Sequence, residues 1–431
     1  MNVSHYSNVT KTVHSSDDYP PTPHIIICVD GVGISIINEM QAEGHFRMFR
    51  SPAHMISTFP SLTNAAISTI LAPEGARTPA GYEDNYFDVN ANKMRGGIAD
   101  RLRSDRFIQG TFRQMFDYHP SAMKSGLGYI APPFSIYLES LSDLSRLRQK
   151  AKRSKQPVFL GYIGATDSLA HLGGEKLLRR FLKRLDKTVH EIKRDRRTPV
   201  VISVFSDHGN DFCTYKRAGL RAPFEQAGFK FETRIMDERS VVFPQFGLIG
   251  SAVLFTRPAN TDHLAQVAAT VEGVDFAAYE KGGTVHVVGP DAEATIEKRN
   301  GCYRYRSLKG DPLGLMTVVR NNEADGFIPD AVWFEATRTD MRPDVVKRIF
   351  EGTTDGVVNR GNVVINFKDG YYTGSSLLDS LATLHATHGN ICQGQSYGFV
   401  MSTEIDLPSH LRADDLWKLL GSPQLAKGAH S

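Results

Sequence analysis

Three aspartates each follow a short run of apolar residues. Asp30 ends HIIICVD, Asp167 ends PVFLGYIGATD, and Asp207 ends PVVISVFSD. Such runs are typical of strands that are buried on both faces of a parallel sheet. Ligands of open α/β sheets bind beyond the carboxyl ends of the strands. The pattern therefore predicts that the three carboxylates meet at one sheet edge.

Histidines accompany these aspartates. His171 follows Asp167 by four residues, His208 is next to Asp207, and His385 and His388 lie far downstream in LHATHGN. Carboxylates mixed with imidazoles suit Zn²⁺ better than Mg²⁺ or Ca²⁺, which prefer oxygen ligands alone. These side chains are too many for one tetrahedral ion. We therefore expect two divalent ions, Zn²⁺ with Mn²⁺ as the alternative.

Each of these features also has a purely structural interpretation. An Asp-Gly pair after a strand is commonly a turn, and an Asp-His pair is commonly a capping feature. A single histidine at such a position is commonly a surface residue. Their coincidence at one predicted sheet edge is what favours a metal site.

A candidate nucleophile lies in STFPSLTNAAISTIL, residues 57–71. Residues 65–71 have helix-forming composition, and Thr63 stands where the N-cap is expected. A helix N-terminus binds phosphate readily, and a metal ion beside a hydroxyl makes it nucleophilic near neutral pH. Thr58 and Ser61 flank a proline that favours extended backbone. Thr63 is therefore the preferred candidate, and the alternative is that it only caps the helix.

The elements that position these residues follow from the hydrophobic pattern. Apolar residues recur at helical spacing from Leu177 to Ile192, between the second and third apolar runs. Strand, helix and strand in this order form a βαβ unit, which implies a parallel sheet. A second helix is predicted around residues 134–150. The fold class is therefore α/β.

The middle of the chain has a different character. Short β-like pieces surround one helical stretch near residues 262–271, which predicts a smaller α+β lobe that is inserted into the main sheet or packed on it. After residue 340 the alternation of helix and strand resumes, with strands at 363–367 and 398–402. We predict the following parts: a flexible N-terminal tail, 1–22; a catalytic core, 23–249 and 311–405; the α+β lobe, 250–310; and a C-terminal tail, 406–431.

Composition excludes several classes of function. The chain has 431 residues, with 50 Lys+Arg against 47 Asp+Glu and a formal net charge of +3. This balance predicts neither a nucleic-acid polymer nor a membrane surface as a partner. The four cysteines form no CxxC pair, which argues against a disulfide framework. The first 23 residues contain no apolar signal-peptide core, so we expect a cytoplasmic protein. Its oligomeric state is not predicted.

The segments VDGVG, SLTNAAISTILA, TDSLAH, SDHG and THG occur in this order. Together they resemble the alkaline phosphatase superfamily, over residues 24–210 and 340–403. Within that superfamily the chain is most similar to the branch of nucleotide pyrophosphatases/phosphodiesterases and phosphonoacetate hydrolases. The resemblance implies an alkaline phosphatase-like three-layer sandwich with a mostly parallel central sheet and a smaller α+β lobe.

The resemblance also implies roles for individual residues. Two sets of ligands would each hold one zinc ion: Asp167, His171 and His388, and Asp30, Asp207 and His208. Thr63 would be the catalytic nucleophile and would itself contact the metals. His388 matches the family better than His385, because a glycine follows it. Asn64, next to the nucleophile, would bind a phosphate oxygen.

The implied activity is hydrolysis of a small phosphorylated substrate, either a monoester or a diester. The threonine alkoxide would attack phosphorus and form a phospho-threonine, which water then hydrolyses. Residues 64–66 are Asn-Ala-Ala, where the phosphodiesterase branch usually has Pro and Asn. Two alternatives therefore stay open. One is a non-catalytic member that binds metal or phosphate, and the other is a relative that cleaves a phosphonate or uses another acceptor.

Overall fold

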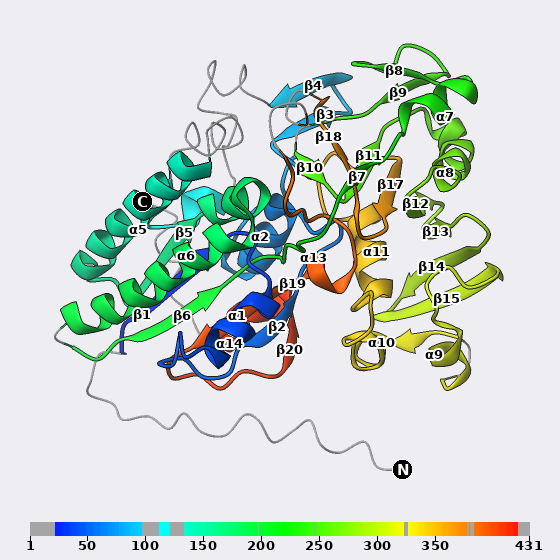
Figure 1. Ribbon diagram of the computed structural model, residues 1–431. Helices are drawn as coiled ribbons and strands as arrows, with labels where there is room; N and C mark the ends of the chain where they lie inside the picture. Colours follow the sequence, from blue (N-terminus) through cyan, green and yellow to red (C-terminus); the bar gives the residue numbers. More distant parts are fainter. Residues whose placement is uncertain are drawn as a thin grey trace.

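The computed structural model describes residues 22–96, 112–120, 133–196, 198–245, 247–322, 326–376, 379 and 383–420. In them the chain forms an α/β fold with two large sheets, which lie on the left and on the right of Figure 1. Residues 1–21 of the predicted N-terminal tail and residues 421–431 lie outside the described residues. Among the helices that are described, none combines the length and the apolar character that crossing a bilayer requires.

In the described part of the chain, the first sheet has six strands in the order β20-β2-β19-β6-β1-β5. Their bounds are β1 His24–Val29, β2 Ala53–Ile56, β5 Val158–Ile163, β6 Val201–Phe205, β19 Tyr397–Ser402 and β20 His410–Arg412. β1 pairs in parallel with β5 and β6, and β2 pairs in parallel with β20. β19 is antiparallel to both β2 and β6. The sheet is thus mostly parallel, as predicted.

Helices cover both faces of this sheet (Figure 1). α1 (Ile34–Ala42), α5 (Pro133–Arg153) and α6 (Ala165–Asp195) pack on one face. α2 (Thr63–Leu71) and α14 (Leu416–Leu420) pack on the other. This arrangement is the three-layer sandwich that the sequence predicts.

The central strand β1 shows why the layers form. Its side chains alternate between the two hydrophobic cores: Ile25 and Ile27 pack with α5 and α6, whereas Ile26 and Cys28 pack with α2 and α14. Successive side chains of a strand point to opposite faces, so an all-apolar strand needs a helical layer on each side.

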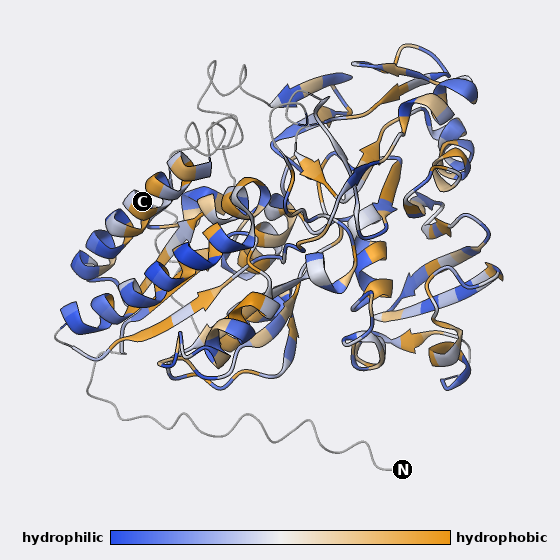
Figure 2. Cartoon of the chain, in the orientation of Figure 1, coloured by the Kyte–Doolittle hydropathy of each residue, from blue (hydrophilic) through white to orange (hydrophobic). Residues whose placement is uncertain are grey.

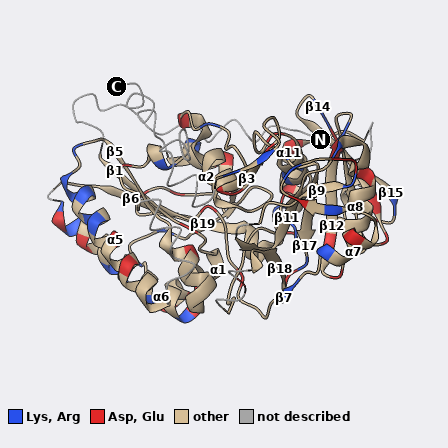
Figure 3. Cartoon of the chain, turned by 90° about the horizontal axis from the view of Figure 1, so that it is seen from above, with Lys and Arg blue, Asp and Glu red and all other residues tan. Residues whose placement is uncertain are grey.

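The two long helices of the outer layer are amphipathic. α6 contains the predicted stretch from Leu177 to Ile192, and α5 contains the predicted residues 134–150. Apolar residues mark one side of each helix in Figure 2, and Lys, Arg, Asp and Glu lie along their outer surfaces in Figure 3. The apolar side of each helix therefore faces the sheet.

The second sheet has seven strands among the described residues, in the order β11-β17-β12-β13-β14-β15-β16. Its neighbouring strands pair antiparallel. The bounds are β11 Ser251–Leu254, β12 Val274–Lys281, β13 Thr284–Val288, β14 Glu293–Arg299, β15 Cys302–Lys309, β16 Ile328–Pro329 and β17 Val363–Phe367. α8 (Thr261–Ala269) packs on one face, and α10 (Asp330–Thr337) and α11 (Val345–Thr354) pack on the other.

Two segments lie elsewhere than the sequence analysis expects. β17 belongs to the second sheet, although residues 311–405 were assigned to the core. Its residues are all buried, and an apolar run of this kind fits a central strand of either sheet. Within the predicted C-terminal tail, β20 joins the first sheet and α14 packs on it.

The remaining elements are short. They are β3 Asn85–Asp88, β4 Lys93–Gly96, β7 Lys216–Arg217, α7 Arg221–Gln226, β8 Lys230–Glu232, β9 Ser240–Val242, β10 Leu248–Ile249, α9 Met316–Arg320, β18 Tyr371–Gly374 and α13 Gln393–Ser396.

Candidate metal centre

The carboxyl ends of the central strands carry three of the predicted residues. Asp30 directly follows β1, and Asp207 and His208 follow β6 after one serine. β1 and β6 are paired in parallel, so these residues lie at the same edge of the sheet. All three are buried.

Asp167 and His171 lie in the first turns of α6, which begins two residues after β5. Both residues therefore lie on one helix. Residues four positions apart share a helix face, and His171 Nε2 is 3.2 Å from Asp167 Oδ1. The helix therefore points both side chains in the same direction.

His388 comes from the loop between β18 and α13, far away in sequence. Its Nε2 is 3.6 Å from Asp167 Oδ1. The side chains of Asp167, His171 and His388 each offer one ligand atom, and these atoms lie within 4.8 Å of one another. We name this group of residues cluster A. His385 is exposed and lies outside it.

Asp30, Asp207 and His208 form a second group, cluster B, whose ligand atoms also lie within 4.8 Å of one another. His208 Nε2 is 3.5 Å from Asp30 Oδ1 and 3.4 Å from Asp207 Oδ2. The two clusters adjoin, because the rings of His208 and His388 stack with their centroids 4.0 Å apart. The structure thus brings together the six side chains that were predicted to form the two sets of zinc ligands.

Thr63 lies beside cluster B. Its Oγ1 donates a hydrogen bond to Asp30 Oδ1 at 3.2 Å and is 3.2 Å from His208 Nε2. Thr63 is the first residue of α2, and Leu62 takes the N-cap position in which the sequence analysis placed Thr63. The shift is one residue, and the hydroxyl still stands at the helix N-terminus.

Hydrogen bonds behind the clusters orient two of the imidazoles. His388 Nδ1 lies 2.8 Å from the carbonyl oxygen of Ser61, and His208 Nδ1 lies 2.9 Å from that of Gly209. A carbonyl oxygen only accepts, so Nδ1 carries the proton in each ring and Nε2 presents a lone pair to the cluster. Metal-ligating histidines are held in this way.

Burial sets the protonation of the carboxyl groups. Desolvation raises the pKa of Asp207 to about 7. Desolvation, together with the charges of Asp207 and Asp167, also holds the pKa of Asp30 well above its usual range. Burial opposes ionisation of Asp167 as well, but the neighbouring His171 and His388 lower the pKa of Asp167 well below its usual range.

The imidazoles respond in the opposite direction. Desolvation lowers the pKa of His388 to about 3, and it lowers the pKa of His208. Both rings are therefore neutral near pH 7, which is the form that binds metal ions. The Oδ2 atom of Asp207 is buried and has no hydrogen-bond partner among the described residues. These donors fit divalent cations, which would offset the mutual repulsion of the carboxylates.

Two supporting residues were missed by the sequence analysis. Tyr162 of β5 donates a hydrogen bond from its hydroxyl to Asp30 Oδ2. Asn210 donates from Nδ2 to Asp167 Oδ1 at 3.0 Å and to the carbonyl oxygen of Gly31 at 2.7 Å. Asn210 lies two residues after His208, and this short spacing could have indicated from the sequence that it supports the site. Tyr162 lies in an apolar strand, and nothing in the sequence indicates such a role.

Asn64, the predicted substrate-binding residue, follows Thr63 on α2. Its Nδ2 donates a hydrogen bond to Asp84 Oδ1 at 3.2 Å. Three aromatic residues of the segment 82–87 differ in position: Tyr82 and Tyr86 line a small pocket, whereas Phe87 is buried against Phe255.

Comparison with solved structures shows the fold. Human ectonucleotide pyrophosphatase/phosphodiesterase 5 matches with a TM-score of 0.52 and 11% sequence identity, over 92% of this chain and 93% of that one. Phosphonoacetate hydrolase from Sinorhizobium meliloti 1021, in complex with phosphonoformate, gives 0.51 and 12%, over 92% and 94%. An inactive murine ectonucleotide pyrophosphatase/phosphodiesterase 5 in complex with AMP gives 0.50 and 12%, over 95% of each chain.

No protein-family profile matches the chain, and no curated protein sequence does. The structural matches extend over nearly the whole length of both partners, so the chain has the alkaline phosphatase-like fold of these proteins. The resemblance that the sequence motifs indicate is confirmed at the level of the fold.

Proposed function

We propose that the chain is a metal-dependent hydrolase of phosphoesters in which Thr63 is the nucleophile. The observation that carries the proposal is the position of the Thr63 hydroxyl. It lies at the N-terminus of α2 and 3.2 Å from both a carboxylate and an imidazole of cluster B. A hydroxyl in this position has a proton acceptor beside it and a phosphate-binding helix terminus behind it.

Each cluster would hold one divalent ion, Zn²⁺ or alternatively Mn²⁺, through its carboxylate oxygens and imidazole nitrogens. Such ions supply Lewis-acid stabilisation of phosphoryl oxygens and make a nearby hydroxyl more acidic. Asn210 and Tyr162 would fix the orientation of the carboxylates of Asp167 and Asp30, respectively.

The residues of the chain perform the following steps in this proposal. The free backbone N–H groups at the start of α2 bind the phosphoryl group next to the Thr63 hydroxyl. Thr63 Oγ1 gives its proton to Asp30 Oδ1, to which it already donates, and forms a bond to phosphorus. The bond between phosphorus and the alcohol oxygen breaks, and the alcohol leaves with the proton that Asp30 accepted. Water then cleaves the phospho-threonine and restores the hydroxyl.

Asn64 is the proposed ligand of a non-reacting phosphate oxygen. Its amide already lies beside Thr63, and its hydrogen bond to Asp84 fixes the side chain. The AMP of the murine complex is a small phosphorylated ligand, which supports a small phosphorylated substrate here. A cytoplasmic location stays a prediction from the sequence.

Hydrolysis of p-nitrophenyl phosphate and bis-p-nitrophenyl phosphate tests the proposal, together with Thr63→Ala. We expect the zinc-loaded protein to hydrolyse at least one of them and Thr63→Ala to lose at least about 10³-fold in kcat. Thr69→Ala removes the same group from the same helix, farther from the clusters, and should keep full activity. Two bound zinc ions without turnover that depends on Thr63 would favour the non-catalytic alternative.

A further inference from the structure

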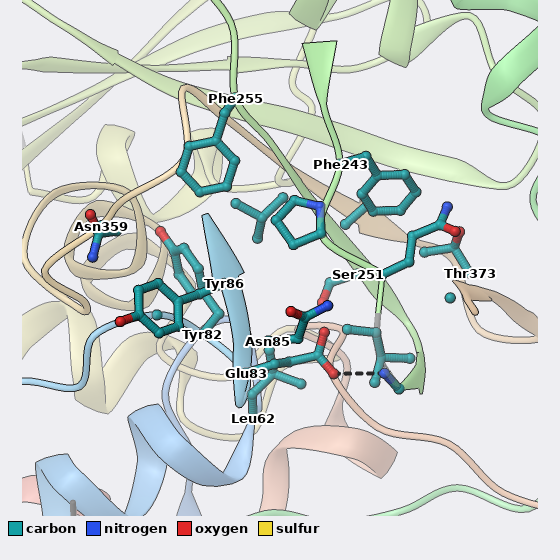
Figure 4. Close-up of a pocket in the computed structure, with 18 residues that line it drawn as sticks. Leu62, Tyr82, Glu83, Asn85, Tyr86, Phe243, Ser251, Phe255, Asn359 and Thr373 are labelled. Atoms are coloured by element: carbon teal, nitrogen blue, oxygen red, sulfur yellow. Dashed lines mark hydrogen bonds between the residues drawn. The ribbon is translucent and has the colours of Figure 1, made fainter. Parts of the chain in front are cut away.

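A small pocket adjoins the candidate nucleophile on the side of the second sheet (Figure 4). Leu62, which precedes Thr63, lines it. The loop that contributes Glu83 and Asn85 to the pocket is joined to Asn64 through the hydrogen bond to Asp84.

The opposite wall of the pocket is connected to cluster A. Ser251 lines the pocket, and a Cβ atom placed on Gly389 would lie 3.1 Å from the Ser251 hydroxyl. Gly389 follows the cluster A residue His388, whose carbonyl oxygen accepts a hydrogen bond of 2.7 Å from the backbone of Gly250. The pocket is thus lined by Leu62, the sequence neighbour of Thr63, on one side and by Ser251, the sequence neighbour of Gly250 that bonds to His388, on the other.

The walls of the pocket are mainly apolar. Tyr82, Tyr86, Phe243 and Phe255 line it, and none of its lining residues in the described part of the chain is Lys, Arg or His. No lining cation is therefore present to pair with a second phosphate or with a carboxylate of a ligand. Such an anion would lose its hydration without compensation.

The exceptions are six polar side chains: Glu83, Asn85, Gln245, Ser251, Asn359 and Thr373. The polar ends of Glu83, Asn85 and Ser251 are turned toward the same part of the pocket in Figure 4. Glu83 Oε1 accepts a hydrogen bond of 2.9 Å from the Gly247 backbone. The Ser251 hydroxyl is buried and has no hydrogen-bond partner among the described residues, although a buried hydroxyl is normally paired. A ligand oxygen that reached it would satisfy it.

The pocket is small. Its volume is about 30 Å³, whereas one water molecule needs roughly 10–15 Å³ by the same measure. An occupant of about two or three non-hydrogen atoms fills such a space. An aromatic ring requires that a wall residue move or be shortened.

We propose that this pocket is a substrate subsite that takes a short, uncharged group carrying one hydroxyl or ether oxygen, attached to the phosphoryl group that Thr63 attacks. The inference rests on the proposed function and gives its substrate class. The substrate would then be a phosphoester with a small, neutral, polar organic group. A second anionic group, such as the carboxylate of phosphonoacetate, is disfavoured.

Non-hydrolysable probes test the pocket separately from catalysis. The four probes are ethylphosphonate, 2-hydroxyethylphosphonate, phosphonoacetate and phenylphosphonate, and calorimetry with zinc-loaded protein measures their affinities relative to inorganic phosphate. We expect 2-hydroxyethylphosphonate to bind at least about 10-fold more tightly than phosphonoacetate and phenylphosphonate. Equal affinities for all four probes would overturn the proposal.

Two variants assign the effect to the pocket. Ser251→Ala should reduce the ratio of the affinity for 2-hydroxyethylphosphonate to that for ethylphosphonate by about 10-fold, because it removes the partner of the ligand's hydroxyl group. Phe243→Ala should make room for a ring and improve the binding of phenylphosphonate by at least about 10-fold relative to ethylphosphonate. Phe231→Ala is the control, because Phe231 packs on Phe243 but does not line the pocket. Identical affinity ratios in the two Phe variants would contradict the proposal.

The outcomes separate the inference from the proposed function. Selective probe binding without hydrolysis of any phosphoester would retain the pocket and overturn the hydrolase. Hydrolysis that depends on Thr63, together with unselective probe binding, would retain the hydrolase and overturn the pocket. Failure to bind inorganic phosphate and to hydrolyse esters would contradict both.

Discussion

The buried carboxylates Asp30 and Asp207 are costly groups in the absence of a cation. Desolvation raises the pKa of each, the charges of Asp207 and Asp167 raise that of Asp30 further, and Asp207 Oδ2 lacks a hydrogen-bond partner in the described structure. A protein that buries charges without pairing them loses stability. Two divalent cations would remove this cost, which is why the clusters are best explained as ligand sets rather than as structural polar groups.

Asn210 should strengthen metal binding in cluster A through its hydrogen bond to Asp167. Asn210→Ala removes this bond, which is one of the contacts that orient Asp167. We expect the affinity of cluster A for Zn²⁺ to fall by roughly 10–100-fold, measured by competition with a chromophoric chelator.

Asn366→Ala is the control for the loss of any buried amide. Asn366 is fully buried, and its side chain bonds to Asp275 and to the backbone of Ile391. This control should leave the zinc affinity unchanged. An Asn210→Ala protein that binds zinc as tightly as the parent would show that Asp167 needs no such support.

Glu83 should make the stability of the protein depend on pH. Burial raises the pKa of Glu83 from 4.5 to about 7. Between these values the folded chain retains a proton that the unfolded chain has lost, so this group lowers stability as pH rises from about 4.5 to 7. The Tm of Glu83→Gln minus the Tm of the parent should therefore be more positive at pH 8 than at pH 5. A difference that is equal at both pH values would refute the assignment.

The residues that could be predicted from the sequence are those placed at strand ends. Asp30, Asp167 and Asp207 each follow an apolar run, and the geometry of parallel sheets brings such positions together. Tyr162 could not be found in this way, because a tyrosine inside an apolar strand has the same pattern as a core residue. His388 was identified through family resemblance, since its partners are more than 200 positions away.

At the scale of elements, α6 shows how one helix serves both the core and the site. Its first turns carry Asp167 and His171, and its later turns pack on the first sheet. The two parts are separated at Gly174, where φ is 68° and ψ is −179°. Few residues other than glycine adopt this conformation.

Gly174→Ala should therefore destabilise the protein. The strain at this position costs about 1–3 kcal/mol of the free energy of unfolding, measured by urea denaturation. Gly219→Ala is the control: Gly219 has no positive φ, and a new Cβ there would meet no atom within 4 Å. Equal losses in both variants would show that the backbone conformation at Gly174 is not the cause.

Elements were predictable from the sequence where the hydrophobic pattern extended over a long segment. The helical spacing of α6 and the apolar runs of β1, β5 and β6 fixed the type of each element. The sheet to which a strand belongs was not predictable in the same way. The apolar run of β17 fits a parallel or an antiparallel neighbour equally well, and only its pairing with β11 and β12 assigns it.

At the scale of the whole molecule, the candidate site lies where the two sheets and their helices meet. Arg348 of α11 is buried and donates to the carbonyl oxygen of Thr58 at 3.0 Å, to Ser61 Oγ at 3.1 Å and to Ser396 Oγ at 2.7 Å. These bonds attach the segment before Thr63 to the second sheet's helical layer. Contacts from the layers of both sheets therefore fix the position of the nucleophile.

Removing metal should weaken the whole molecule, because ligands from distant segments meet only in the folded state. We expect a strong chelator to lower Tm by several degrees and added Zn²⁺ to restore it, since an ion that binds only the folded chain stabilises it by mass action. Differential scanning calorimetry measures the change. A Tm that is unaffected by chelator and by zinc would indicate that the clusters bind no metal.

The most direct test of the central claim is anomalous diffraction at the zinc edge from crystals of the metal-loaded protein. The account predicts two peaks, one among Asp167, His171 and His388 and one among Asp30, Asp207 and His208, with the Thr63 hydroxyl beside them. A single peak elsewhere, or no peak at either cluster while zinc is present in the crystal, would contradict it.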